Sequence, residues 1–385
     1  MTKTYPAWAT PPTENFLAVD DLTPEEANAL GAAINDLVET GDTPGSDCIG
    51  IPSAEFNVDG LQSVTTLFRS ILRNIHLDTA NKVKVDVAGA AAPNSASWPS
   101  IIALANGNLL CAYYDGGGDE GISCKISADK GVTWGVAITI YKHAATVETI
   151  PWLLQLANGT VLCFFQTSED SATNHIKCMK STDNGATWGT KVNVCTSESV
   201  NYPCACQLEN GNVLCFFGNG ASNAVLKSIS TDNGATWSVA VTMYSGSVDC
   251  PGVYVFNGRI YFWARHNDGG GSTFRFYKSD DNGESWSGMI GSFSTTSTTN
   301  RASLLFFPGG GIVAVYSDGS NLYATISRNQ CVTWIGQKLI AAVLYIEVSI
   351  CQLSDSQIVI AFETVEDAAA LHVKIYNNIW AYLKP

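Results

Sequence analysis

The octapeptide STDNGATW occurs twice in the chain, at residues 181–188 and 230–237. Variants of it stand on either side: SADKGVTW at 127–134, SDDNGESW at 279–286 and a more altered copy, SRNQCVTW, at 327–334. Successive copies begin about 50 residues apart, which is the length of one four-stranded propeller blade. The chain is therefore predicted to repeat one supersecondary unit.

Two apolar runs joined by a tight turn precede each octapeptide, as expected for a β-hairpin. Six such hairpins occur: 101–114, 152–165, 204–217, 253–264, 304–316 and 350–362. We predict an all-β fold, a six-bladed β-propeller of four-stranded antiparallel blades, over residues 81–385. The last hairpin has no octapeptide after it. We expect the alternating segment KVKVDV (82–87) to supply the outer strand of that blade and to close the ring.

Residues 1–80 differ in kind and predict a small helical N-terminal region. LTPEEANALGAAINDLVETGD (22–42) has Thr23 as a cap and Pro24 at the first helical position. DGLQSVTTLFRSILRNIHLD (59–78) has one apolar face at helical spacing. Two short helices bury little core alone, so we expect this region to pack on the propeller, on copies of itself as in a homo-oligomer, or on the other proteins of a larger assembly such as a virion.

Composition restricts the partners. Among 385 residues, 46% are hydrophobic and 15% charged, and the net charge is −14. Such an acidic chain repels phosphate backbones and anionic lipid, so no nucleic-acid partner is expected. No apolar run is long enough to span a bilayer, and the first residues do not resemble a signal peptide. We expect no membrane insertion and no cleaved signal, with the protein either virion-associated, as in a phage tail, or cytoplasmic.

The twelve cysteines follow the repeat instead of forming obvious pairs. Cys111, Cys163 and Cys215 occupy the same position in successive hairpins, so we interpret them as small buried hydrophobes. Cys204 and Cys206 have C-x-C spacing, but no second Cys or His pair matches it. We therefore expect no metal site and no cofactor.

The octapeptide resembles the Asp-box, or BNR, repeat of sialidases, and the resemblance covers about three quarters of the chain. The box itself is expected to be structural, with its aspartate accepting hydrogen bonds from the turn and its tryptophan packing the blade. The resemblance implies a sialidase-like propeller whose site lies where the innermost strands begin.

Carrying the family's site over position by position gives a partial match. The resemblance places the family's acid at Asp119 or Glu120, its fourth-blade glutamate at Asp249, and its nucleophilic tyrosine at Glu347, with Tyr345 close by. Asp119, Asp249 and Glu347 are therefore the candidate catalytic residues. Of three arginines that hold the substrate carboxylate, only Arg265 matches. The first falls on Ser97 and the third near Ser320, where Arg301 is a candidate substitute from a neighbouring strand.

The residues that begin the innermost strands suit a sugar, because aromatic rings stack on its apolar face and charged groups bond its hydroxyls. The candidate substrate-binding residues are Arg265, Arg301, Trp98, Trp152 and Tyr202. Packing is an alternative role for the three aromatic residues, and a structural ion pair is an alternative for Arg301 and Glu347.

Three functions remain open. The first is a glycan-recognition propeller, as in a phage tail or virion receptor-binding protein that binds a cell-surface carbohydrate. The second is a glycoside hydrolase of altered, sialidase-like specificity that uses the channel carboxylates, since such enzymes need only two. The third is a purely structural or assembly propeller. Loss of two arginines argues against ordinary sialidase activity.

Overall fold

The computed structural model describes the propeller and not the N-terminal region. The described residues are 82–86, 96–116, 120–143, 146, 148–169, 173–196, 199–220, 222–246, 248–267, 272–295, 301–308, 310–318, 321–341, 347–354, 357–364 and 370–377. The chain divides into two compact units, 1–81 and 82–385. Both predicted helices lie outside the described residues, so the docking role of residues 1–80 stays a prediction.

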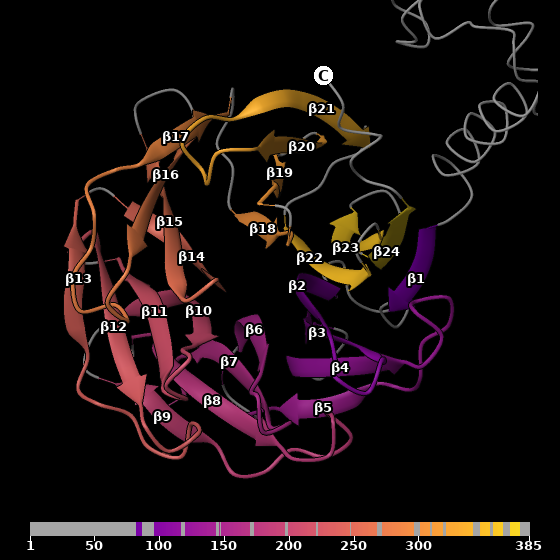
Figure 1. The fold of residues 1–385 in the computed structure, drawn as a ribbon. Coiled ribbons are helices and arrows are strands. Elements are labelled where there is room, and N and C mark those ends of the chain that lie inside the picture. The colour runs from indigo at the N-terminus through magenta and orange to yellow at the C-terminus, as the bar shows by residue number, and fades with distance from the viewer. Residues whose placement is uncertain are drawn as a thin grey trace, which may run out of the picture. The chain divides into compact units, whose positions relative to one another are not determined.

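Six four-stranded antiparallel sheets, the blades, are arranged around one central axis (Figure 1). Blade 1 contains β2 (Ala96–Ala103), β3 (Leu109–Asp115), β4 (Gly121–Ser127) and β5 (Ile138–Tyr141). Blade 2 contains β6 (Thr149–Gln155), β7 (Val161–Thr167), β8 (His175–Ser181) and β9 (Val192–Cys195). Blade 3 contains β10 (Val200–Gln207), β11 (Val213–Asn219), β12 (Ala224–Ser230) and β13 (Val241–Ser245).

The other three blades repeat this order. Blade 4 contains β14 (Val248–Phe256), β15 (Arg259–Asn267), β16 (Ser272–Ser279) and β17 (Gly291–Ser294). Blade 5 contains β18 (Ala302–Phe306), β19 (Ile312–Ser317), β20 (Leu322–Ser327) and β21 (Ile335–Ala341). Blade 6 contains β22 (Val348–Ser354), β23 (Gln357–Thr364) and β24 (Ala370–Asn377), with β1 (Lys82–Asp86) as its outermost strand.

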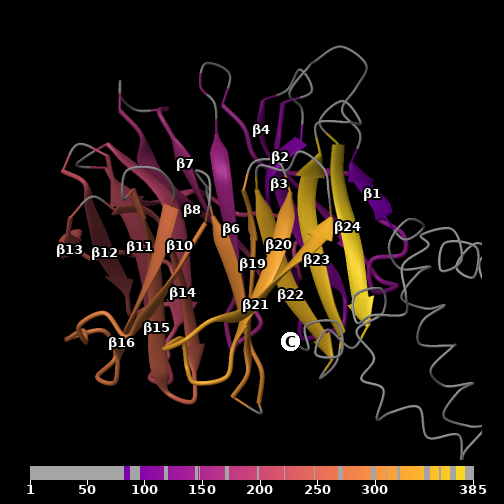
Figure 2. The ribbon, with the colours of Figure 1, turned by 90° about the horizontal axis from the view of Figure 1, so that it is seen from above.

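Strand β1 closes the ring as the sequence predicts. It pairs antiparallel with β24, with Lys82 opposite Lys374 and Val83 opposite Val373. The outer strand of the last blade thus comes from the start of the propeller, which the side view of β1 and β24 also shows (Figure 2). The predicted six-bladed, all-β architecture is confirmed. Among the described residues no helix is long and apolar enough to cross a membrane.

The hydrophobic core lies between neighbouring blades. Box tryptophans pack onto the preceding blade: Trp237 of blade 3 meets Phe164 of blade 2 edge to face, with ring centroids 5.5 Å apart. Gly185 of the blade 2 box, at φ +88°, touches Leu110 of blade 1, where a Cβ would lie 2.8 Å from a leucine methyl carbon. The box glycine therefore supplies both a left-handed backbone and a close approach.

The box aspartates are turn formers, as the sequence predicts. Asp183 accepts hydrogen bonds at 2.8 Å from the Thr187 N–H and the Ser181 hydroxyl. These bonds, the Thr187 hydroxyl first among them, lower the pKa of Asp183 to about 2. In the altered blade 5 copy, Asn329 accepts from the Thr333 N–H at the same 2.8 Å. The amide thus reproduces the turn without a charge.

The hairpin cysteines are buried, as predicted for core residues. Cys111, Cys163 and Cys215 are each fully buried in the interblade clusters. The ten cysteines whose side chains the structure describes are all free thiols. They therefore act as small apolar side chains within these blades.

Candidate active site at the channel mouth

The innermost strand of every blade lines the central channel. One cavity of about 560 Å³ is lined by the later residues of these strands, from Ala103 and Gln155 to Gln352. A second, of about 20 Å³, lies where the strands begin, beside Pro99, Pro151 and Arg301. Trp152 is among the residues that line both cavities, so the wide part of the channel adjoins its narrow end. This narrow end, the channel mouth, is where sequence analysis places the candidate site.

A β-bulge at the start of the innermost strands shapes the mouth. The strand register of blades 1 to 4 shifts just before or at a proline. The residue before that proline has positive φ in three blades: Trp98 at 52°, Ile150 at 57° and Tyr202 at 52°. A left-handed backbone is costly for bulky or β-branched residues and is kept where the surroundings enforce it. Each bulge adds a residue that re-aims the side chains of the rim.

Arg301 reaches across the mouth. It precedes β18 of blade 5, yet its Nη2 donates to the Pro203 carbonyl of blade 3 at 3.1 Å. Its guanidinium carbon lies 5.8 Å from the ring centroid of Trp152, in blade 2, and 5.7 Å from that of Tyr202. The side chain is only 8% exposed. The guanidinium is therefore held by cation–π contacts from two blades as well as by a hydrogen bond.

The predicted aromatic residues have defined partners at the same end. The Trp152 indole N–H donates to the Ala205 carbonyl at 3.1 Å, which links blade 2 to blade 3. The Trp98 ring packs on Tyr114 with centroids 5.5 Å apart. Trp98, Trp152 and Tyr202 all remain partly exposed. Their rings thus contribute to interblade packing and still present surface at the rim.

Two glutamates lie at the mouth end of blade 6. Val348 pairs with Phe362, so the register places Glu347 opposite Glu363. Both side chains are nearly fully buried, at 1% and 5% exposure. Burial raises the pKa of Glu363 to about 7, although the Trp98 N–H donates to its Oε2 at 3.1 Å and the Ser97 hydroxyl also bonds it. Ser97, the position of a family arginine, thus contacts a carboxyl group instead.

Further carboxylates surround Tyr114 in blade 1. Burial raises the pKa of Tyr114, and the charges of Glu120, Asp115 and Glu148 raise it further. Glu148 is completely buried, and its Oε1 accepts from the hydroxyls of Thr146 at 2.8 Å and Thr167 at 3.1 Å. Burial also raises the pKa of Glu148. Blades 6, 1 and 2 therefore each carry acidic groups at the mouth.

The remaining predicted residues are placed less completely. Arg265 on β15 is 6% exposed, and the register sets it opposite Asp249 on β14. Asp119 and Tyr345 lie outside the described residues. The structure thus brings together Arg301, Trp152 and Tyr202. It also gives Glu347 a neighbour, Glu363, that the sequence did not lead us to predict.

That neighbour, Glu363, leaves a signal in the sequence. It ends the run IVIAFE in the second strand of its blade, at the same position that Arg265 has in the run IYFWAR of blade 4. Arg265 lies opposite Asp249 of the innermost strand, and Glu363 directly follows Phe362, which pairs with Val348 of the innermost strand. Comparing all six blades at this position would have identified Glu363 together with Arg265. Comparing equivalent positions of the blades does not predict that Arg301 contacts Trp152, because the two residues come from blades on opposite sides of the channel.

Metal ligation finds no support within the described ranges, where no group of three or more His, Cys, Asp or Glu side chains is placed to hold an ion. Cys204 and Cys206 are both buried, and burial raises the pKa of each thiol, to about 12 for Cys206. A thiol held protonated in this way is a poor metal ligand.

Comparisons with known proteins agree with this fold. Residues 97–253 match the family model described as a BNR repeat-like domain. Curated proteins give no match. Among solved structures, a Hadza microbial sialidase is similar with a TM-score of 0.63 at 17% identity, over 77% of this chain and 68% of that one.

Two further structures show the range of proteins with this fold. A leech intramolecular trans-sialidase complexed with 2,7-anhydro-Neu5Ac has a TM-score of 0.63 at 13% identity, over 80% of this chain and 72% of that one. A Penicillium chrysogenum α-L-arabinanase complexed with arabinobiose has a TM-score of 0.59 at 16% identity, over 78% and 98% of the two chains. At such identities the likeness is one of fold.

Proposed function

We propose that this protein, a sialidase-like six-bladed propeller with BNR repeats, binds a glycan at its channel mouth. The observation that carries the proposal is the Arg301 guanidinium, fixed between the rings of Trp152 and Tyr202. Rings at this position offer an apolar face to a sugar, and a preorganised cation beside them orients its oxygens. Recognition is favoured because these groups are already held in place in the free protein.

The distribution of charge at the mouth also supports a sugar ligand. Arg265 and Arg301 come from blades 4 and 5, whereas Glu347 and Glu363 come from blade 6. A ring of hydroxyls can donate to carboxylates on one side and accept from guanidinium groups on the other. Two of the similar structures are complexes with a sugar derivative and with a disaccharide, which is consistent with such a ligand here.

A glycan array with the purified chain tests this proposal. Trp98→Ala and Arg265→Ala should each weaken binding of the best glycan by about tenfold, since each removes a contact group. Arg301→Lys keeps the charge and loses the planar stacking, so it should weaken binding as well. Arg328→Ala, at an exposed position of the blade 5 box, is the matched control. Binding that none of the three mouth substitutions changes would place the site elsewhere.

Hydrolysis of a glycoside is the second candidate, and Glu363 favours it. A buried carboxyl whose pKa is raised to about 7 stays protonated near neutrality, as a general acid must. Glu347 lies opposite it in the strand pair and would serve as nucleophile or base. Asp119 and Asp249 stay candidates for the same roles on the basis of sequence alone.

A panel of chromogenic glycosides that includes a sialoside separates binding from turnover. If the protein hydrolyses one of them, Glu363→Gln and Glu347→Gln should each abolish turnover without changing the circular dichroism spectrum. The anomeric form of the first product, followed by NMR, then distinguishes a retaining from an inverting mechanism. Full activity in either variant would remove that residue from the chemistry. No binding on the array together with no turnover in this panel would favour a structural or assembly propeller.

We further propose that the glycan is a cell-surface receptor and the chain a component of a phage tail or virion. The acidic charge and the two amphipathic segments predicted within residues 1–80 support this role. Fluorescently labelled full-length chain should bind intact host cells, and prior removal of surface polysaccharide should abolish that binding. Equal binding to stripped cells would contradict a glycan receptor.

A further inference from the structure

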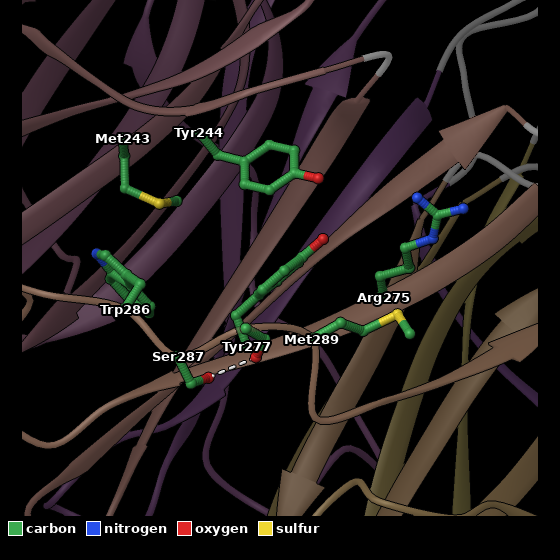
Figure 3. A pocket seen from close by; sticks show the side chains of 8 residues that line it. Met243, Tyr244, Arg275, Tyr277, Trp286, Ser287 and Met289 are labelled. Atoms are coloured by element: carbon green, nitrogen blue, oxygen red, sulfur yellow. Dashed lines mark hydrogen bonds between the residues drawn. The ribbon is translucent and has the colours of Figure 1, made fainter.

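A second cavity lies away from the channel, between the outer strands of blades 3 and 4. Its volume is about 470 Å³, within the roughly 300–1,000 Å³ typical of small-molecule sites. Tyr244 and Met243 come from β13, and Tyr277 and Arg275 from β16. Trp286 ends the blade 4 box, and the rest of the lining, Ser287, Gly288 and Met289, follows it. Figure 3 shows these side chains arranged around one space.

The polar groups of this interblade pocket gather at one end. Figure 3 shows the hydroxyls of Tyr244 and Tyr277 extending toward the side on which the Arg275 guanidinium lies. Arg275 Nη1 lies 3.1 Å from Nδ1 of His266, and Nε2 of that ring lies 3.4 Å from the Tyr277 hydroxyl. The Tyr244 and Tyr277 ring centroids are 5.2 Å apart.

The direction of these hydrogen bonds follows from their chemistry. A guanidinium only donates, so Nδ1 of His266 accepts and the neutral ring carries its proton on Nε2. Nε2 then donates to the Tyr277 oxygen. Tyr277 in turn bonds to Tyr244, and burial, followed by this bond, raises the Tyr277 pKa. The chain of bonds leaves the Tyr244 O–H as a donor, on the side of the pocket where Arg275 lies (Figure 3).

The opposite end of the pocket is apolar. Met243 and Trp286 line it, whereas Met289, which is 56% exposed, lies on the side of Arg275 (Figure 3). Thioether and indole groups contact flat apolar ligands well, because both are polarisable. The part of the lining that the structure describes contains no carboxylate. The pocket therefore combines a cationic, hydrogen-bond-donating end with an apolar wall.

The repeat shows that the fold does not require these residues. Measured from the box tryptophan and from the serine that ends the third strand, the equivalents of Tyr244 and Arg275 at the junction of blades 2 and 3 are Cys195 and Leu226. Leu226 is buried in an ordinary hydrophobic cluster there. The junction of blades 2 and 3 is thus packed by apolar residues at the equivalent positions. The polar groups of the blade 3–4 junction go beyond what packing needs.

We infer that the interblade pocket binds a small organic anion, a carboxylate attached to a flat body with an apolar face. The carboxylate lies at the Arg275 and Tyr244 end, and the flat body lies against Trp286 and Met243. Two kinds of molecule have this chemistry: an aromatic carboxylic acid and a carboxylated sugar. This inference does not depend on the channel mouth.

Isothermal titration calorimetry on the full chain tests the site with two probes, indole-3-acetate and N-acetylneuraminate. Indole-3-acetamide is the uncharged counterpart of the first. Arg275→Leu copies the residue of the neighbouring junction and should leave the fold intact. This substitution should weaken binding of either carboxylate by about tenfold or more, because one charge-assisted hydrogen bond is lost. It should leave binding of indole-3-acetamide unchanged. Tyr244→Phe should weaken carboxylate binding severalfold, and Arg328→Leu should not change it.

Each result decides the inference. Binding of either probe that requires Arg275 and Tyr244 supports the site. The probe that binds more tightly then shows whether the ligand is an aromatic carboxylic acid or a carboxylated sugar. Absence of binding by both probes at about 10 mM overturns the inference. So does wild-type affinity in the Arg275→Leu chain. N-acetylneuraminate binding that Arg301→Lys weakens and Arg275→Leu does not belongs to the channel mouth, and it overturns the interblade site for that probe.

Discussion

Replacing Glu363 by glutamine should make the protein more stable at alkaline pH and leave it unchanged in acid. The carboxyl is 5% exposed, and burial raises its pKa from 4.5 to about 7. The folded state therefore binds the proton more tightly than the unfolded state does. The free energy of unfolding is highest below the unfolded pKa and falls as pH rises toward 7. The full difference is about 3 kcal/mol. Glutamine keeps the acceptor for the Trp98 N–H and cannot ionise, so it escapes this loss.

Urea unfolding of the wild type and the Glu363→Gln variant, each at about pH 4 and pH 8, measures the effect. At the lower pH the two proteins should have the same free energy of unfolding, and at the higher pH the variant should exceed the wild type by about 2 to 3 kcal/mol. Glu209→Gln, at an exposed turn, is the control and should show no such difference. An advantage of the variant that stays constant with pH would show that Glu363 does not ionise abnormally, and the general-acid role would lose its basis.

Three further predictions concern the scaffold. Ser349→Ala should lower the free energy of unfolding by about 1 to 2 kcal/mol, because the Ser349 hydroxyl accepts a hydrogen bond from the Ile101 N–H at 3.1 Å and so links the last blade to the first. Urea unfolding measures this loss, and no change would mean that water replaces the bond. Asp183→Asn should leave the melting temperature nearly unchanged, as Asn329 holds the same turn, whereas Asp183→Ala should lower it; equal effects of both would contradict the turn role. The ten described cysteines should resist a thiol reagent at pH 8 until urea is added, since all are buried and burial raises the pKa of Cys124 and Cys351 to about 12; rapid labelling of any of them, located by mass spectrometry, would refute this.

The repeat made the fold predictable from sequence. Box turns and Asn-Gly hairpins are local signals, so each blade could be recognised by itself. The closing strand was also predictable, because 82–86 alternates in polarity and the sixth hairpin needs a partner. The beginning of the innermost strands was harder. The bulge at Ile150 depends on backbone geometry that no residue type announces, least of all a β-branched one.

The channel mouth was predictable in its residues but not in their relations. Arg301, Trp152 and Tyr202 were each identified by their position in a blade, yet their mutual contact depends on the reach of one side chain across the ring. The raised pKa of Glu363 comes from burial, which only the packed structure defines. The interblade pocket was not foreseen, because its residues are unlike their equivalents in the other blades.

The pairing of β1 with β24 also has a consequence for biosynthesis. The ribosome makes β1 before any other part of the propeller, and its partner emerges only after nearly all six blades have been translated. Throughout that time β1 is a strand without its neighbour, and such edges invite association with other chains. Contacts between such distant parts of a chain also form slowly. Ring closure is therefore expected to be the last step of folding, and the nascent chain to be most vulnerable to aggregation just before it.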